Sequence, residues 1–492
     1  MIKAASFREL ERYSRDDIFD TLGVQEDIGK NIISRLLRSN ILKARSDSTS
    51  INTEELRSSD IAIGNFDISN SDKRFVFDYV GLIDMTIGDR NFILNCFPKY
   101  IKRHEKDFKL ADMQPFVRAI EQYNKSQQYT ITVSTEFDDR IQYNPLAIIL
   151  FLLRDYWEHG IYANSKEILE HNGTSEIEWE STISQTIPLI KNGRPFYMDY
   201  FTAETTTDES DYITRLHEFL LTKYSKHLHE TKLDDLFGVE TVELYEGEQS
   251  DFGDTDYIEQ RILREINVQF VTHKQTLLRA MYALIHKTGH MEEESGLSLY
   301  GTNSFHRVWE EVCAEVFASQ LNVPIKNLPL YLTGEYKNDS RTLLELISKP
   351  QWYNYKNGEK QGAAKTLIPD YISICAKEDL LYFVIMDAKY YDIKLPPQLS
   401  GNPGVDDVDK QYLYQLAYRD FIESHNLMPV NAFLCPGDIE NFDVAGEVEM
   451  PIFSGLGLTN IKVVILSAVK MMEAYLSGKQ LDLSKELSGL FS

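Results

Sequence analysis

Two aspartates and a lysine stand out within a stretch of sequence that is otherwise almost wholly apolar. Pro369 and Asp370 precede the run YISICAKEDLLYFVIM, and sixteen residues separate Asp370 from Asp387, Ala388 and Lys389. The run is typical of two strands joined by a short charged turn. Side chains at i and i+2 of a strand share one face, so Asp387 and Lys389 project together while Ala388 points into the packing. A hairpin would also return Asp370 towards Asp387, so we expect two carboxylates and an ammonium to converge.

This arrangement predicts a metal-dependent phosphodiester hydrolase. Two carboxylates in a pocket repel by several kcal/mol at ~4 Å with an effective dielectric of about 20, so a cation is needed between them. Mg²⁺ takes oxygen ligands and keeps several waters, and Mn²⁺ can substitute for it. We expect Asp370, Asp387 and the carbonyl of Ala388 to be ligands. Lys389 would orient or help to deprotonate the attacking water and offset charge in the transition state.

The spacing of these residues resembles the PD-(D/E)XK nuclease signature. The resemblance implies a restriction-endonuclease-like core at the C-terminus, and an additional acid from the first helix of that core. Glu310, Glu311 and Glu315 are available on SFHRVWEEVCAEVFASQL, and Glu310 is our choice. For each of these acids, a solvated helix face is the alternative.

The helix that follows the hairpin carries polar residues that related nucleases use to hold phosphate and water. Gln411 and Gln415 are one turn apart and could both face the hairpin, together with Lys410 and Tyr418. The segment YQLAY is similar to the corresponding helix of McrC-like restriction subunits. The alternative is an amphipathic helix whose apolar residues belong to the core.

Several other blocks of sequence resemble the LlaJI-type restriction endonucleases. They are FDYVGLI, FILNCFPKY, LLRDYWEHGIY, FHRVWEEVC, PQWYNYKNG and VIMDAKYYDI, and they span most of residues 70 to 440. The resemblance implies cleavage of double-stranded DNA at a short sequence. It also implies an AAA+ GTPase partner of McrB type and a cognate DNA methyltransferase encoded nearby.

The elements around the hairpin must position these side chains. Periodicity predicts a helix at 304–321, the hairpin at 369–391, a helix at 406–425, a strand at 428–436 and a closing helix at 461–476. This order favours an α/β (α+β) domain with a mixed sheet, within a multidomain chain whose N-terminal and middle regions are mainly helical.

The chain of 492 residues is long enough for two or three domains. We expect a small helical or winged-helix unit with a linker at 1–60, a strand hairpin followed by a mainly helical recognition or partner region at 61–290, and the nuclease domain at 291–492. In the first unit, short helical patterns begin with a capping pair of Ser14 and Asp17, and the polar linker covers 46–60. An ordinary amphipathic helix pair is the alternative to a winged helix.

Charge and cysteine content narrow the class of protein. The formal net charge of −25 disfavours a general nucleic-acid binder, so DNA binding would depend on a local surface, a metal or a partner. Residues 349–365 interleave lysines with aromatic residues and are the best local candidate for a DNA-facing surface, or else a solvated loop. The four dispersed cysteines and the lack of an apolar leader or span predict a cytoplasmic protein without disulfides.

Three other patterns bear on where chemistry could occur. Asp84 and Lys99 suggest a second nuclease hairpin, but Phe97 stands where the acid is needed. His227 and His229 suggest a metal pair, although surface histidines are the simpler interpretation. The sequence has no G-x-x-x-x-G-K-[ST] motif, so nucleotide-driven motion must come from another chain.

Two rival functions fit the same residues. One is a repair or recombination nuclease with the same catalytic core. The other is a noncatalytic subunit that binds DNA or a motor and retains the nuclease fold.

Three acids lie at the start of the helix predicted after the hairpin. They are Asp406, Asp407 and Asp409, and we expect them to interact with the positive end of the helix dipole rather than to bind metal.

Overall fold

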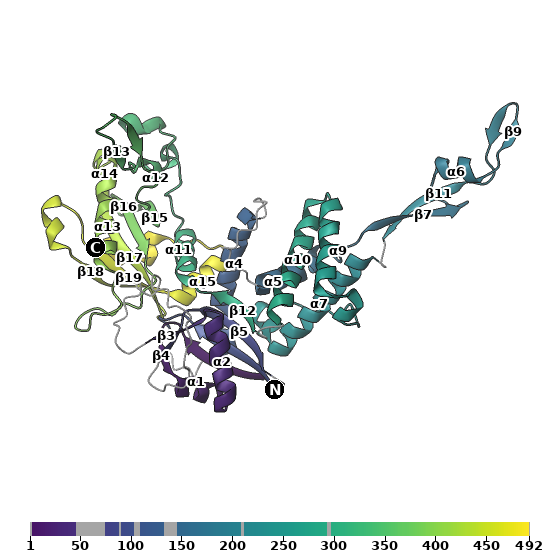
Figure 1. Ribbon diagram of the computed structural model, residues 1–492. Helices are drawn as coiled ribbons and strands as arrows, with labels where there is room; N and C mark the ends of the chain where they lie inside the picture. Colours follow the sequence, from purple (N-terminus) through teal and green to yellow (C-terminus); the bar gives the residue numbers. More distant parts are fainter. Residues whose placement is uncertain are drawn as a thin grey trace. The chain divides into compact units, whose positions relative to one another are not determined.

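The computed structural model describes residues 2–45, 74–87, 90–102, 109–131, 145–207, 211–292 and 297–491. The predicted linker at 46–60 lies outside these residues. The protein is of mixed α/β type with several sheets (Figure 1). It divides into two compact units, one formed by Met1–Gln142 with Leu297–Ser492, and the other by Tyr143–Gly296. In the described ranges, no helix has the length and apolar character needed to cross a membrane.

The N-terminal part of the first unit combines helices with strands. Its elements are β1 (Ile2–Arg8), β2 (Arg12–Ser14), α1 (Arg15–Leu22), α2 (Glu26–Arg38), β3 (Leu42–Arg45) and β4 (Arg74–Phe77). Ser14 and Asp17 form the predicted capping box at the start of α1. The helical prediction was wrong for β1, which pairs in parallel with a later strand. β2 precedes the helix pair, β3 and β4 follow it, and the three strands form a sheet of order β2-β4-β3.

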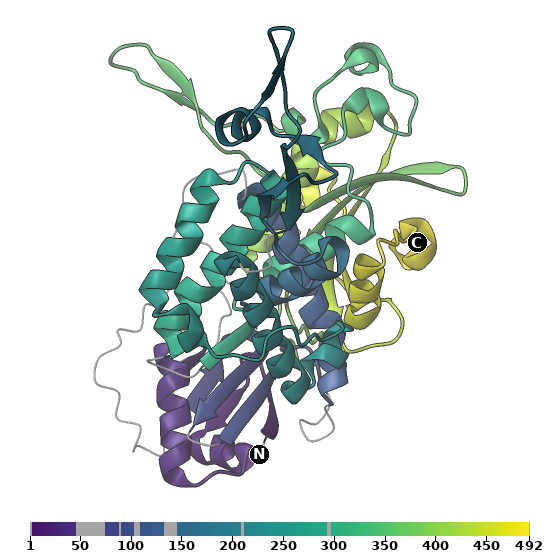
Figure 2. The ribbon, with the colours of Figure 1, turned by 90° about the vertical axis from the view of Figure 1, so that its right-hand side faces the viewer.

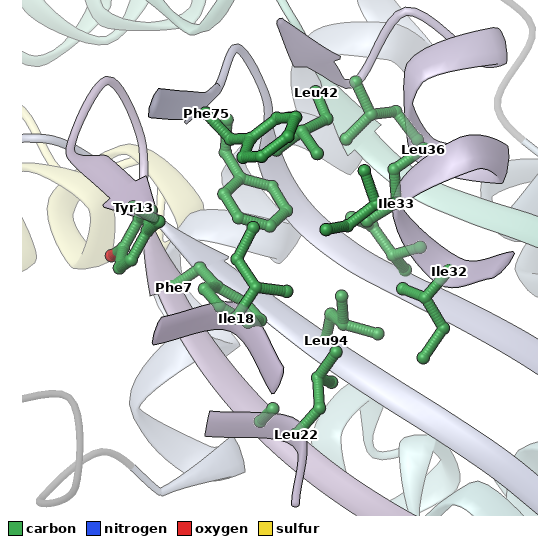
Figure 3. Close-up of a cluster of buried hydrophobic side chains, with 14 of the residues drawn as sticks. Phe7, Tyr13, Ile18, Leu22, Ile32, Ile33, Leu36, Leu42, Phe75 and Leu94 are labelled. Atoms are coloured by element: carbon green, nitrogen blue, oxygen red, sulfur yellow. The ribbon is translucent and has the colours of Figure 1, made fainter. Parts of the chain in front are cut away.

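A second sheet shares its hydrophobic core with this region. It has the order β1-β6-β5-β12, with β5 (Val80–Ile87), β6 (Arg90–Phe97) and β12 (Leu297–Thr302). The strand hairpin predicted within 61–290 is confirmed as β5 and β6, which pair antiparallel. Figure 3 shows the core, in which Phe7, Ile33 and Leu94 are fully buried. Phe7 of β1 packs in this cluster together with residues from helices and other strands, so β1 is an integral part of the core.

The C-terminal part of the first unit contains a five-stranded mixed sheet of order β15-β16-β17-β19-β18. Its strands are β15 (Tyr371–Lys377), β16 (Leu380–Ala388), β17 (Met428–Gly437), β18 (Asp443–Val448) and β19 (Ile461–Ser467). The predicted hairpin is confirmed as antiparallel β15 and β16, and β17 adds to β16 in parallel. The apolar character of β16, β17 and β19 fits strands that are largely buried on both faces of the sheet.

Helices cover this sheet and confirm most of the predicted order. They are α11 (Phe305–Val316), α13 (Val405–Ala417), α14 (Arg419–Ser424) and α15 (Ala468–Leu476). A further helix, α4 (Gln114–Ile131), packs on α11 and α15 and contacts β5 and β12 of the other sheet. Trp309 of α11 is fully buried, and its Nε1 donates to the Leu434 carbonyl of β17 at 3.1 Å. Residues of α13 and α14 pack on β15 and β16 through Tyr414, Tyr418 and Phe421.

The prediction of a closing helix was wrong for its first half. Residues Ile461–Ser467 form β19, a strand paired with β17 and β18, and α15 starts only at Ala468. The run IKVVILS is rich in β-branched residues, which pack well in a strand, and a short apolar run shows no period that would distinguish the two structures.

The second unit is a helical bundle with a strand-built arm. Its helices are α5 (Pro145–His159), α6 (Trp179–Gln185), α7 (Tyr212–Thr231), α8 (Leu233–Phe237), α9 (Thr255–Val268) and α10 (Thr272–Glu292). Helices α5, α7, α9 and α10 lie side by side in both ribbon views (Figures 1 and 2). The predicted helices of this region are confirmed, with a break between α9 and α10.

The arm was missed by the mainly helical prediction. It consists of β7 (Ser165–His171), β8 (Glu176–Ile177), β9 (Leu189–Lys191), β10 (Arg194–Phe196) and β11 (Phe201–Thr207) around α6. β7 and β11 pair antiparallel and lead from the bundle to β9 (Figure 1). Short strands with polar, threonine-rich faces give a weak signal, which explains why the sequence pattern did not predict them.

The remaining elements are short. They are α12 (Leu343–Leu346), α16 (Leu483–Glu486), β13 (Gln351–Tyr353), β14 (Lys360–Gly362), and the 3₁₀ helices η2 (Leu110–Met113), η3 (Gln249–Phe252), η4 (Ile325–Asn327), η5 (Gly334–Asn338), η6 (Pro451–Leu456) and η7 (Ser488–Phe491).

Candidate active site

The hairpin brings the two predicted aspartates to the same end of the sheet. Tyr371 pairs with Met386, which places Asp370 beside the last residues of β16. The backbone N–H of Ala388 donates to Oδ2 of Asp370 at 2.9 Å. This bond fixes the Asp370 carboxyl against the strand that carries Asp387.

Asp387 and Lys389 meet as the i, i+2 spacing predicts. Lys389 Nζ lies 2.7 Å from Asp387 Oδ2 and 2.7 Å from Asp407 Oδ1, so the ammonium is held between two carboxylates. The side chains of both acids are almost fully buried, and that of Lys389 is 15% exposed. Burial by itself would lower the pKa of Lys389, but the two carboxylates outweigh burial and raise this pKa above its usual range.

The proton affinity of Asp370 is strongly raised in this site. Burial raises the pKa of Asp370 to about 9, assisted by a hydrogen bond with Asp387 and by the negative charges of Asp387 and Glu310. The Ala388 N–H opposes this rise only partly. Three acids are therefore near enough to one another for their repulsion to be felt, which is the condition under which a cation would be stabilised.

The acids of α11 lie in different surroundings. Glu310 is partly buried and acts electrostatically on Asp370. Glu311 instead accepts a hydrogen bond from the Tyr475 hydroxyl of α15 at 2.9 Å, and Glu315 is exposed. Of these three, Glu310 is the residue whose charge acts on Asp370.

The two glutamines of α13 also separate. Gln411 is fully buried, and its Nε2 donates to the Ile385 carbonyl of β16 at 2.9 Å, while its Oε1 has no hydrogen-bond partner among the described residues. Gln415 is engaged elsewhere, since its Oε1 accepts from Asn431 Nδ2 at 2.7 Å. Gln411 is therefore the glutamine attached to the strand that carries Asp387.

Asp407 is the residue near this site that the sequence interpretation missed. It was expected to favour the helix end, but its carboxylate is buried and binds Lys389, and its Oδ2 accepts from the Tyr391 hydroxyl at 3.3 Å. A signal was present, because Asp407 precedes Gln411 by one helical turn and therefore shares its buried face.

Residues from the N-terminal region border the site. Tyr390 follows Lys389 in the chain, and its hydroxyl donates to the buried carboxylate of Glu9. Lys99 Nζ lies 4.5 Å from the centre of the Tyr390 ring. Phe97 is buried in β6, so Lys99 belongs to a structural hairpin beside the site rather than to a second nuclease motif.

The other features named from the sequence have surroundings of their own. His229 is exposed and binds Asp234 at 2.7 Å. Residues 349–365 contain the exposed hairpin of β13 and β14, in which Trp352, Tyr353 and Tyr355 face solvent. All four cysteines are free thiols, as predicted.

Comparisons with known proteins identify the family. The model of the LlaJI restriction endonuclease family matches residues 79–471. The chain is 30% identical over 413 residues to the type II restriction enzyme BsuMI component YdjA of Bacillus subtilis, covering 82% of this chain and 81% of that protein.

Two solved structures from Thermococcus gammatolerans are also similar. A chain from an assembly of McrB AAA+ hexamers with bound McrC has 14% identity and a TM-score of 0.40, covering 96% of this chain and 99% of that one. A chain of the McrBC complex has 13% identity and a TM-score of 0.27, covering 57% and 79%. From the family model and the Bacillus relative, the chain belongs to the LlaJI restriction endonuclease family.

Proposed function

We propose that the chain is a Mg²⁺-dependent DNA endonuclease of PD-(D/E)XK type that acts in a restriction system. The observation that carries the proposal is the meeting of Asp370, Asp387 and Lys389 at one end of the sheet. Membership of the LlaJI family supports the choice of DNA cleavage over other phosphodiester chemistry.

The donor set at this end of the sheet suits a hard divalent cation. Burial and the neighbouring acids raise the pKa of Asp370 to about 9, so the ionised carboxylate is unfavourable here unless a cation lies beside it. Asp370 and Asp387, with the Ala388 carbonyl, offer the oxygen ligands that Mg²⁺ and Mn²⁺ take. When bound, such an ion supplies Lewis-acid stabilisation of charge on the scissile phosphate.

The protein groups have separate roles in the proposed reaction. Lys389 keeps its proton because Asp387 and Asp407 stabilise the ammonium, so it offsets phosphate charge and orients water rather than accepting a proton. Gln411 presents a buried amide oxygen that has no partner among the described residues, which suits an ordered water. Glu310 adds a third acid beside Asp370.

DNA must approach an acidic protein through a local surface. The β13–β14 hairpin shortly precedes Asp370 in the chain and exposes Trp352 and Tyr355, with Lys360 Nζ lying 5.2 Å from the centre of the Tyr353 ring. Lysines and aromatic residues on one projecting hairpin favour binding to the sugar-phosphate backbone. We propose that this hairpin contacts the duplex.

A GTPase partner of McrB type is part of the proposal. The sequence lacks a phosphate-binding loop of its own. Beyond the bundle of the second unit, the arm exposes Ile187, Leu189, Ile190, Phe196 and Met198, and an apolar patch of this kind is typical of a protein-binding surface. A cognate DNA methyltransferase encoded nearby completes the expected restriction system.

Cleavage of circular plasmid DNA tests this function. The full chain is incubated with Mg²⁺, alone and with the proposed McrB-type GTPase plus GTP, on plasmid with and without methylation by the proposed cognate methyltransferase. Discrete fragments whose yield depends on methylation support a restriction endonuclease. Progressive loss from DNA ends would instead indicate a repair or recombination nuclease, and DNA binding without Mg²⁺-dependent cutting under every condition would indicate a noncatalytic subunit.

A further inference from the structure

A second cluster of side chains that can bind metal lies in the helical unit. It shares no residue with the proposed nuclease site of Asp370, Asp387 and Lys389. Asp155 and His159 are four residues apart on α5, so they share one face of that helix. His273 is the second residue of α10, which packs against α5. One ligand atom from each of these three residues lies within 4.8 Å of the other two.

The three groups are already directed at one point. Oδ1 of Asp155 lies 2.5 Å from His273 Nε2 and 3.2 Å from His159 Nδ1. The two imidazole rings have centroids 4.0 Å apart. Two histidines from different helices therefore converge on a single carboxylate oxygen.

The carboxylate in this cluster is incompletely satisfied. Asp155 is only 4% exposed, and its second oxygen, Oδ2, is buried with no hydrogen-bond partner among the described residues. A buried carboxylate oxygen without a partner is destabilising, and native proteins rarely leave one uncompensated. A cation bound by this carboxylate would neutralise its charge and so reduce the cost of leaving Oδ2 without a partner.

We propose that Asp155, His159 and His273 bind a zinc-class transition-metal ion. Two imidazole nitrogens and one carboxylate oxygen form a three-ligand set that Zn²⁺ accepts, with water in the fourth position. The side chains of His159 and His273 are 51% and 38% exposed, so an ion and its water can enter from solvent. Mg²⁺ prefers oxygen ligands, so this cluster and the nuclease residues select different metals.

The two distances that involve Asp155 require only a small adjustment. In a tetrahedral zinc site, ligand atoms bonded at ~2.0–2.1 Å are about 3.3 Å apart. The separation between Asp155 and His159 is already close to this value, at 3.2 Å. The separation between Asp155 and His273 must widen by roughly 0.8 Å, which a rotation of the His273 ring can supply.

The position of the cluster indicates what the ion does. His159 is the last residue of α5, and the arm begins at β7 shortly after it, while His273 is in the first turn of α10. An ion bound by all three would cross-link the two helix ends at the base of the arm. It therefore acts as a structural clamp on the helical unit.

Metal binding by the full chain tests the clamp. The chain is stripped with chelator, and Zn²⁺ binding is followed by calorimetry and by elemental analysis after dialysis. We expect about one strongly bound ion per chain, and a higher Tm with Zn²⁺. His159→Ala and His273→Ala should each weaken the Kd more than about a hundredfold, beyond the effect typical of outer ligands.

Matched variants separate this site from others. His229→Ala removes a histidine that pairs with one carboxylate, that of Asp234. Asp387→Asn changes a residue of the proposed nuclease site. Both should leave Zn²⁺ binding unchanged. Because His159 is half exposed, its variant should fold, and its Tm without metal should match that of the original chain. Retention of the ion by His159→Ala and His273→Ala, or no Zn²⁺ binding by the original chain, would overturn the proposal.

Discussion

Lys389 Nζ lies 2.7 Å from Asp407 Oδ1, although Asp407 belongs to the helix that follows the hairpin of Asp370 and Asp387. The helix therefore does more than cover the sheet, because it supplies a second carboxylate that holds the lysine in place. Without Asp407, the Asp387 carboxylate would be the principal partner of Lys389.

Asp407→Asn should slow DNA cleavage by about ten- to a hundredfold, because the lysine loses one of the two charges that orient it. DNA affinity should stay the same, so the change appears in the rate at saturating DNA. Asp406→Asn is the control, because Asp406 is exposed one residue earlier on α13. Equal rates for the Asp407 variant and the control would show that Asp407 does not position Lys389.

The acids of α11 should differ in their effect on cleavage. Glu310→Gln removes a charge that acts on Asp370, so it should lower the cleavage rate and raise the Mg²⁺ concentration needed for half-maximal activity. Glu311→Gln should have little effect on either quantity, since Glu311 binds Tyr475 instead. Titrations of cleavage rate against Mg²⁺ measure both, and a larger effect of the Glu311 variant would reverse the assignment.

The stability of the helical unit should depend on pH through His217. Burial lowers the pKa of this fully buried histidine to about 4, below its ordinary value of 6.5. The folded state favours the neutral imidazole of His217. The free energy of unfolding therefore has its full value above pH 6.5, and it falls as the pH drops from 6.5 towards 4, where only the unfolded state binds the proton. The loss amounts to about 3 kcal/mol of the free energy of unfolding.

His217→Asn should retain an acceptor for the Tyr162 N–H while removing this titration. The difference in unfolding free energy between the original chain and this variant should therefore shrink between pH 7 and pH 4.5, as measured by urea denaturation. His229→Asn serves as the exposed control. A difference that stays constant with pH would contradict the assignment to His217.

The β13–β14 hairpin should contribute to DNA affinity without base specificity. Replacing both Lys356 and Lys360 with alanine should weaken binding and reduce the slope of log K against log salt by roughly 1 for each phosphate that is no longer neutralised. Lys485→Ala is the control, because Lys485 is exposed but pairs with Asp482 at the start of α16. An unchanged salt slope, measured by fluorescence anisotropy, would exclude this hairpin as a surface that binds the DNA backbone.

The convergence of Asp370, Asp387 and Lys389 could be predicted because it depends on local rules. A two-residue turn at Glu378-Asp379 and the alternation of side chains along β16 are enough to place the acids and the lysine. The buried face of α11 was equally readable, since Val308, Trp309 and Val312 recur at helical spacing.

Other features depend on partners that are distant in the sequence. β1 is a strand because it pairs with β6, and β19 is a strand because it lies between β17 and β18. Asp155 and His273 are 118 residues apart, so no local spacing could indicate their interaction. Local propensity is weak at such positions, and tertiary pairing decides the structure.

The central claim is that Asp387 and Lys389 belong to one catalytic centre. The most direct measurement is the rate of Mg²⁺-dependent plasmid cleavage, with the proposed GTPase partner and GTP, by Asp387→Asn, Lys389→Met and the exposed-turn control Asp379→Asn. The first two should cut at least about a thousandfold more slowly at a temperature where circular dichroism shows that they remain folded, and the control should match the original rate. Cleavage at the original rate by either of the first two variants would contradict the account.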